Sequence, residues 1–233
     1  MTVVSYDAGV IMKVRYYPLP SSTFFNLPKE KKLKILEVSM AEFSEHGYQE
    51  SSISSIIKKA KIPRGSFYQY FEDKLDLYKY VVEQVGIKKH EYSQYLTQIT
   101  SEMKFIDIVR NLFIGGIHFY RKHPDMAKIA NDLILNSDQD LKKSLLGEED
   151  KKSNEFFHTL INESKKKHEI DQRLNNETII LLIQTLNLSL VQNFINKSGN
   201  DYFDDKLFSL IDEMMLFLEK GLSIPIQGKE KNF

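Results

Sequence analysis

The amino-acid sequence predicts an all-α fold. Apolar residues recur three, four and seven positions apart along most of the 233 residues, as expected for helices that each bury one face. No stretch alternates apolar and polar residues in the way that a half-buried strand does. Glycine and proline interrupt the helical pattern at several positions, and these residues are expected to separate successive helices.

Two helices are predicted between residues 35 and 60. The first has an apolar stripe and stops at Gly47, the residue type expected just past a helix carboxyl end. The second opens at Ser51 or Ser52, where a hydroxyl can cap free backbone N–H groups. The buried residues of the first helix are expected to be Ile35, Leu36, Met40 and Phe43, and those of the second Ile53, Ile56, Ile57 and Ala60.

A third, short helix begins at about Pro63, because proline cannot continue a preceding helix but suits the first turn of a new one. Phe67 and Phe71 lie four residues apart and therefore share one face. The rest of its surface is polar: Arg64, Ser66, Tyr68, Gln69 and Tyr70. Two short helices in which the second presents such side chains are typical of a helix-turn-helix that reads the DNA major groove.

The run from Ile35 to Leu77 resembles the amino-terminal domain of the TetR family of bacterial transcriptional repressors. The matching residues, all in register, are Phe43, Gly47-Tyr48, Ser51-Ser52-Ile53, Ile56, Ala60, Gly65-Ser66-Phe67-Tyr68-Gln69-Tyr70-Phe71, Lys74 and Leu77. Lys61 stands where the family commonly has glycine, which raises the question whether the turn needs a positive φ. Pro63 stands where the family commonly has serine, which removes one hydroxyl contact.

The resemblance implies how the DNA would be held. Base edges would be met by Arg64, Gly65, Ser66 and Gln69, and phosphates by Ser52, Ser54, Tyr68, Tyr70 and Lys74. Two alternatives stay open, because Gly65 can serve only to let the backbone approach closely and Tyr70 can instead cover the core.

A longer helical region follows. Asp73 is a good amino-terminal cap for a helix that extends toward Ile99, and further helices are expected at 104–122, 124–136, 150–168, 177–197 and 203–221, with Gly147 separating two of them. The predicted organisation is an N-terminal tail (1–27), a helix-turn-helix DNA-binding domain (28–73), a larger ligand-binding and dimerisation domain (74–223) and a C-terminal tail (224–233).

The helices at 177–197 and 203–221 carry more apolar surface than one core needs. TetR-like proteins form dimers through their last two long helices, so the resemblance implies a homodimer and a near-palindromic operator in double-stranded DNA. It also implies an apolar or amphipathic effector, unidentified by the sequence, in an aromatic pocket formed by Phe105, Phe113, Gly116, Phe119, Tyr120, Met126 and Phe156. Close helix packing or a kink is the alternative explanation for the paired glycines Gly115-Gly116.

Residues 1–27 lack helical periodicity and are expected to be a tail or the product of a start site placed too early. The alternative is an arm whose Lys13, Arg15, Tyr16 and Tyr17 touch DNA beside the main site. The formal net charge is zero, but residues 27–75 contain nine lysines and arginines against seven acidic residues. This mild bias predicts that DNA affinity needs two copies acting together.

Several function classes are not supported. The chain has no cysteine, no apolar run long enough to span a membrane and no phosphate-loop or hydrolase signature. The Glu155-x-x-His158 spacing has no second copy, so no metal site, cofactor or enzymatic activity is expected. The sequence predicts a cytoplasmic, ligand-responsive dimeric repressor, with a helical sensor that lacks sequence-specific DNA binding as the alternative.

Overall fold

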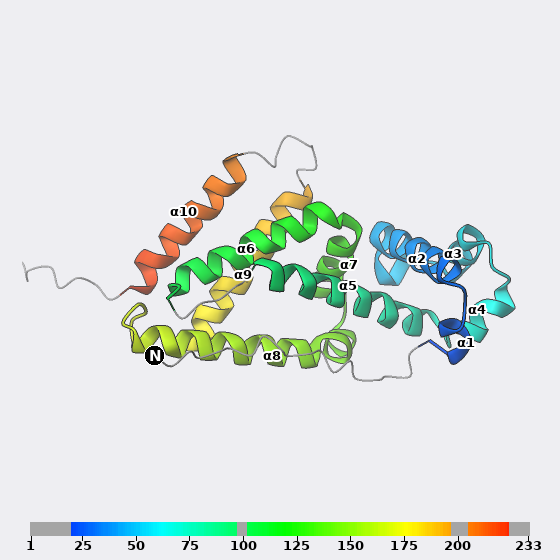
Figure 1. The fold of residues 1–233 in the computed structure, drawn as a ribbon, viewed down its shortest axis with the longest axis horizontal. Coiled ribbons are helices and arrows are strands. Elements are labelled where there is room, and N and C mark those ends of the chain that lie inside the picture. The colour runs from blue at the N-terminus through cyan, green and yellow to red at the C-terminus, as the bar shows by residue number, and fades with distance from the viewer. Residues whose placement is uncertain (1–19, 97–101, 197–204, 224–233) are drawn as a thin grey trace, which may run out of the picture. The chain divides into compact units, whose positions relative to one another are not determined.

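The computed structural model describes residues 20–96, 102–196 and 205–223, and helices are the only regular secondary structure in these ranges (Figure 1). The predicted all-α class is therefore confirmed. The helices are α1 Ser22–Phe25, α2 Lys29–Glu50, α3 Ile53–Ala60, α4 Arg64–Tyr70, α5 Lys74–Leu96, α6 Phe105–Lys122, α7 Pro124–Asn136, α8 Gln139–Lys166, α9 Asn176–Asn196 and α10 Asp205–Leu222.

The chain divides into two compact units. Described residues up to 94 form the first unit with residues 119–146, and described residues between 95 and 118 form the second with those from 147 onward. The first unit thus contains the helix-turn-helix together with most of α5, all of α7 and the start of α8. The predicted boundary between residues 73 and 74, which separates a DNA-binding domain from a ligand-binding domain, does not coincide with the division into compact units and stays a prediction.

The core of the first unit joins α2 to α5 and α7. Phe43 of α2 is buried, and its ring centroid lies 4.9 Å from that of Tyr78 on α5. Burial of such aromatic side chains stabilises the packing by about 2 to 3 kcal/mol each. Helices α2 and α7 share a polar contact, since the Ser44 hydroxyl of α2 donates to Asp125 Oδ1 of α7 at 2.8 Å. This core supports the short helices α3 and α4.

The expected break at Gly47 is present as an interruption within α2. Gly47 has φ 67° and ψ 176°, and helical geometry resumes on its far side up to Glu50. The backbone N–H of Tyr48 donates to Asp132 Oδ2 of α7 at 3.3 Å. The interruption is therefore matched to a carboxylate on the neighbouring helix.

The expectation that residues 1–27 form a tail is wrong for residues 20–27. Ser22–Phe25 form the single turn α1, and the Phe24 side chain is fully buried against aromatic rings of α4 and α5. One buried phenyl group is enough to order a short segment because it removes a large apolar area from water. Residues 1–19, which contain the proposed arm side chains, lie outside the described residues.

The second unit is tied together by α6, α8, α9, α10 and the loop before α9. The Phe105 N–H donates to Glu169 Oε2 at 2.8 Å, and the Arg110 Nε donates to Asp212 Oδ1 at 2.6 Å. The loop N–H of Asp171 donates to the carbonyl of Leu222 at 2.8 Å. These contacts link the start of α6 and the end of α10 to the same loop.

Gly147 does not separate two helices, contrary to expectation. Helix α8 runs without a break from Gln139 to Lys166. A glycine costs a helix interior about 1 kcal/mol relative to alanine, which packing of buried residues on both sides, such as Leu141 and Ile161, can offset.

The start of α5 agrees with expectation, because Asp73 Oδ1 accepts the N–H of Asp76 at 2.8 Å. The predicted break at Ser198-Gly199-Asn200 lies outside the described residues, as do residues 224–233.

Candidate nucleic-acid interface

Helix α3 is joined to α2 through one buried carboxylate. Glu42 is only 2% exposed, and it accepts hydrogen bonds from the Ser52 N–H at 3.2 Å, the Ser55 hydroxyl at 2.6 Å and the Lys59 ammonium at 2.9 Å. Burial raises the pKa of this carboxyl. The hydrogen bonds from Ser55, Lys59 and Ser52 together lower it by more than burial raises it, so the pKa lies below its ordinary value. Glu42 is thus a structural anion that lies outside the predicted apolar stripe of its helix and is nevertheless buried.

The predicted cap of α3 is present. Ser52 Oγ accepts the Ser55 N–H at 3.4 Å, which satisfies one of the free donors of the first turn. Because Lys59 is paired with Glu42, its charge is already partly neutralised. Lys58, the other cation of α3, is also exposed and lies in the last turn before the turn into α4.

In the turn into α4, the backbone of Lys61 adopts a left-handed conformation, although Lys61 stands where the TetR family commonly has glycine. Lys61 has φ 55° and ψ 43°, and its N–H donates to the carbonyl of Lys58 at 3.3 Å. Ile62 is buried and Pro63 is the amino-terminal cap, so α4 begins at Arg64, one residue later than predicted. Lysine accepts this backbone geometry at a cost of about 1 to 2 kcal/mol.

Helix α4 has one buried and one exposed face. Phe67 is fully buried and Tyr70 is 4% exposed, whereas Arg64, Gly65, Tyr68 and Gln69 are exposed. The Arg64 guanidinium carbon lies 5.9 Å from the centroid of the Tyr68 ring, which is 47% exposed. The exposed face therefore presents a fork of donors, an aromatic hydroxyl and an amide, and these groups suit base edges and phosphates.

The other predicted contact residues differ in their exposure and in the hydrogen bonds that they already make within the protein. Ser52, the amino-terminal cap of α3, and Ser54 within α3 are exposed, and Ser66 is half-buried. The Lys74 ammonium donates to the carbonyls of Gln49 at 2.9 Å and Ser51 at 3.2 Å, and it lies 4.8 Å from the centroid of the Tyr48 ring.

Lys74 therefore holds the carboxyl end of α2, in addition to any contact with a phosphate. The buried ring of Tyr70 favours the alternative in which this residue covers the core.

The predicted effector pocket is not found as one cavity among the cavities described. A cavity of about 280 Å³ in the second unit is lined by Phe105, His168 and Glu169, among others, and Phe105 is the only predicted pocket residue that contributes to it. Phe113 is buried in α6 whereas Phe156 is 39% exposed on α8. The remaining members, Gly116, Phe119, Tyr120 and Met126, lie on α6 and α7.

A Cβ at Gly116 would meet the Asn187 side-chain nitrogen at 3.9 Å, an ordinary contact distance. Alanine therefore fits at this position without strain.

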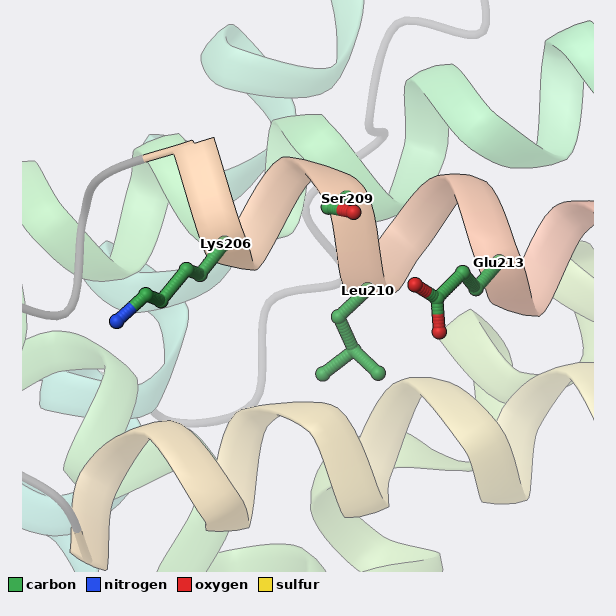
Figure 2. A pocket seen from close by; sticks show the side chains of 4 residues that line it. All are labelled: Lys206, Ser209, Leu210 and Glu213. Atoms are coloured by element: carbon green, nitrogen blue, oxygen red, sulfur yellow. The ribbon is translucent and has the colours of Figure 1, made fainter.

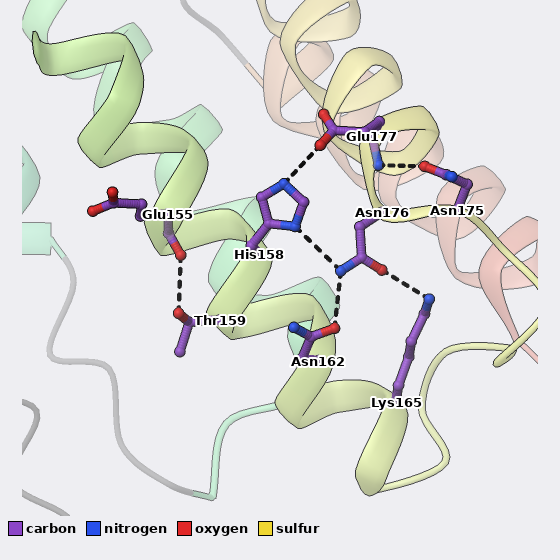
Figure 3. Close-up of polar contacts among 8 residues, drawn as sticks. All are labelled: Glu155, His158, Thr159, Asn162, Lys165, Asn175, Asn176 and Glu177. Carbon is purple, nitrogen blue, oxygen red and sulfur yellow. Dashed lines mark hydrogen bonds and ion pairs between the residues drawn. The ribbon is translucent and has the colours of Figure 1, made fainter.

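His158 takes part in a polar network between two helices. Its Nε2 lies 2.8 Å from Glu177 Oε1 and its Nδ1 lies 3.4 Å from the Asn176 amide nitrogen. Figure 3 draws both contacts and shows the Glu155 carboxylate pointing away from the imidazole. These contacts join α8 to the start of α9. Within the part of the chain that the structure describes, no three metal-ligating side chains gather. None of the described helices is long and apolar enough to span a membrane.

Comparison with known proteins identifies the family. The family model described as "Bacterial regulatory proteins, tetR family" matches residues 35–81, which span most of α2, all of α3 and α4 and the start of α5. Residues 35–81 therefore carry a DNA-binding domain of the TetR family. It is 21% identical over 174 residues to the "Probable acrEF/envCD operon repressor" of Escherichia coli (strain K12), an alignment that covers 73% of this chain and 79% of the relative.

Solved structures of other proteins share this fold. A TetR family transcriptional regulator from Chloroflexus aurantiacus J-10-FL has a TM-score of 0.74 at 24% identity, covering 88% of this chain and 98% of the other. FadR from Bacillus subtilis in complex with stearoyl-CoA has a TM-score of 0.64 at 18% identity, covering 82% and 98%. The relatives and neighbours are named as regulators, and the helix-turn-helix with a larger helical domain is the fold that they share.

Sequence reasoning missed two groups that shape this TetR-family interface. Glu42 is not part of the apolar stripe predicted for its helix, although it directly precedes the buried Phe43 and its helical phase is therefore ambiguous. Ser21 and Phe24 were placed in a tail. The pair Phe24-Phe25 between Pro20 and Pro28 was the available signal, because an apolar pair next to a predicted helix start often packs on it.

Proposed function

We propose that this protein is a dimeric, ligand-responsive transcriptional repressor that binds a near-palindromic operator through α3 and α4. The observation that carries the proposal is the exposed face of α4. This face presents Arg64, Gly65, Tyr68 and Gln69, while the fully buried Phe67 anchors the helix to the core. An isolated helix of seven residues is only marginally stable in water. Because this fold holds such a helix against the core with its polar face outward, we infer that the polar face binds a partner.

The proposed division of contacts follows from exposure. Arg64, Gly65, Ser66 and Gln69 meet base edges, and Ser52, Ser54 and Tyr68 meet phosphates. Lys74 combines a phosphate contact with its hydrogen bonds to two carbonyls, whereas the buried Tyr70 ring contributes by packing α4 against the core. We also propose that the protein works in the cytoplasm, where it would meet a chromosomal operator.

Exposed apolar residues of α9 and α10 support a homodimer. Leu181 is 62% exposed, Leu216 is 50% exposed and Phe217 is 77% exposed. A soluble protein seldom leaves several large apolar side chains of neighbouring segments in water unless a partner covers them. In a two-fold dimer the recognition helices would meet successive major grooves about 34 Å apart.

The α10 surface also has complementary charges. A depression along α10 is lined by Lys206, Ser209, Leu210 and Glu213, and the side chains of Lys206, Leu210 and Glu213 project to the same side of the helix (Figure 2). Lys206 and Glu213 are nearly equidistant in sequence from Leu210. If two copies of α10 cross antiparallel at Leu210, Lys206 of each copy faces Glu213 of the other.

An apolar or amphipathic effector is the proposed signal. The core of the larger domain is rich in buried aromatic side chains such as Phe105 and Phe113, and the similar FadR structure contains stearoyl-CoA. Long-chain acyl thioesters are therefore the first ligand class to test. The ligand releases DNA only if it binds the non-binding geometry more tightly than the binding one.

The deciding experiment measures the affinity of the full chain for a duplex taken from upstream of its own gene and for a random-sequence duplex. The wild-type protein is expected to prefer the upstream duplex, and Arg64→Ala is expected to weaken that complex by about 1 to 3 kcal/mol while changing random-duplex binding much less. Equal affinity of the wild-type protein for both duplexes would instead support a sensor without sequence-specific DNA binding.

A further inference from the structure

Helix α4 ends beside the segment that precedes α2. The N–H of Ser21 donates to the carbonyl of Tyr70 at 2.9 Å, and the Ser21 hydroxyl donates to the carbonyl of Gln69. The last carbonyls of a helix have no partner within the helix, so both bonds satisfy groups that would otherwise need water. Ser21 thus closes the carboxyl end of the helix that carries the proposed base contacts.

The same segment is packed against the elements on both sides of that helix end. The centroid of the fully buried Phe24 ring lies 6.1 Å from Tyr70, 4.9 Å from Phe71 and 5.2 Å from Tyr80. Tyr70 is the last residue of α4, Phe71 follows it and Tyr80 belongs to α5. Phe24 therefore bridges α4 to α5, and α1 lies beside α4 in Figure 1.

A third contact fixes the segment to α2. The Lys32 ammonium donates to the carbonyl of Phe25 at 2.8 Å, and the Lys31 ammonium lies 5.6 Å from the centroid of the Tyr70 ring. Residues 20–27 consequently connect α2, α4 and α5 at one place, although the helix-turn-helix pattern itself begins only later in the sequence.

We infer that residues 20–27 are a strap that positions α4 for base reading, with Ser21 and Phe24 as its positioning residues. The inference rests on the proposed DNA-binding function and adds to it a specificity determinant outside the helix-turn-helix. Reading a base edge requires the side chains of a two-turn helix to be held within a fraction of an ångström, whereas phosphate attraction tolerates a looser helix. Loss of the strap should thus reduce sequence discrimination more than overall affinity.

The test uses three substitutions in the full chain. Ser21→Pro removes both donors and fits the backbone, because Ser21 has φ −53°. Ser21→Thr keeps both donors and should behave as the wild type. Ser22→Ala is the matched control, since it removes an exposed hydroxyl from the neighbouring residue.

The first readout is amide hydrogen exchange of the free protein. In Ser21→Pro the amides of α4 and Phe71 should exchange about tenfold faster, since two hydrogen bonds at the helix end are lost, while those of α3 stay unchanged. The second readout is the ratio of affinities for the upstream and random duplexes, which should fall at least about fivefold with the unfolding midpoint and the salt dependence retained.

Each result is decisive. Unchanged exchange in α4 of Ser21→Pro would overturn the strap whatever happens to DNA binding. Faster exchange with an unchanged affinity ratio would overturn its role in positioning for base reading. A wild-type protein that does not discriminate the two duplexes would refute the proposed function and with it the specificity role, while the exchange data would still show whether residues 20–27 hold α4.

Discussion

Gly47 of α2 and Asp132 of α7 approach each other so closely that a Cβ atom on Gly47 would lie 2.9 Å from Asp132 Oδ2. The same carboxylate oxygen accepts the N–H of Tyr48, and its other oxygen accepts the side-chain amide of Asn136 at 2.8 Å. Glycine is needed here for two independent reasons, the close approach and the positive φ.

Gly47→Ala is expected to lower the free energy of unfolding by about 1 to 3 kcal/mol, because an L residue is strained in this backbone region and its methyl group displaces Asp132. Urea denaturation measures the change. Gly65→Ala is the control, since nothing lies within 4 Å of a Cβ there and a helical alanine should leave stability equal or higher. Similar losses in both variants would argue against the Gly47–Asp132 constraint.

Lys61→Gly is expected to stabilise the protein by about 1 kcal/mol. The left-handed conformation of Lys61 strains a side chain, and glycine relieves the strain at some cost in chain entropy. Lys58→Gly provides the comparison, because Lys58 lies within α3 and the same exchange there should destabilise by about 1 kcal/mol. If thermal unfolding shows both variants to be destabilised, the turn does not store the proposed strain.

Lys74→Ala should affect both stability and DNA binding. Loss of the two hydrogen bonds to Gln49 and Ser51 is expected to cost about 1 to 2 kcal/mol in unfolding free energy. DNA affinity should fall equally for the upstream and random duplexes, because a phosphate contact carries no base information. Lys34→Ala, which removes an exposed ion pair with Glu37, should change stability by less than about 0.5 kcal/mol.

The Glu42 carboxylate predicts an acid-sensitive link between α2 and α3. Its pKa is lower in the folded protein than the ordinary value of 4.5, so the stability that it contributes is present above that pH and is lost as the pH falls through the folded pKa. Denaturation between about pH 7 and about pH 3 should show wild-type stability falling more steeply than that of Glu42→Gln. Parallel pH profiles for the two proteins would contradict this role of Glu42.

The proposed α10 pairing predicts a charge-swap result. Lys206→Glu should weaken the dimer, because it places like charges opposite each other at the two-fold axis, and Lys206→Glu with Glu213→Lys should restore it. Analytical ultracentrifugation measures the dissociation constant. Phe217→Ser tests the wider apolar surface independently, and a wild-type protein that sediments as a monomer at micromolar concentration would exclude the dimer.

The helices were predictable because their signals are local. The stripe of Ile35 and Phe43, the Asp73 cap and the break at Pro63 each follow from spacing or residue chemistry within one turn. The prediction that Gly147 ends a helix is wrong, because α8 continues through it from Gln139 to Lys166. The helix-breaking tendency of glycine can be read from the local sequence, whereas the tertiary packing that outweighs it cannot.

The candidate site was predictable only where exposure follows from helical phase. Arg64, Tyr68 and Gln69 lie on the exposed face as expected. The partners of Lys74 and the attachment of Ser21 to Gln69 and Tyr70 connect residues that are 23 to 49 positions apart, and no periodicity encodes such pairs. Their roles depend on how separate segments meet.

The docking of α2 against α7 limits how this regulator can be recombined with others. A fragment that ends at residue 73 leaves the Ser44 hydroxyl without Asp125 and the Tyr48 amide without Asp132. A hybrid protein that transplants the DNA-reading segment onto a foreign sensor therefore has to carry residues 119–146 along with it, or rebuild those carboxylates on the new scaffold. The transferable module is a discontinuous one.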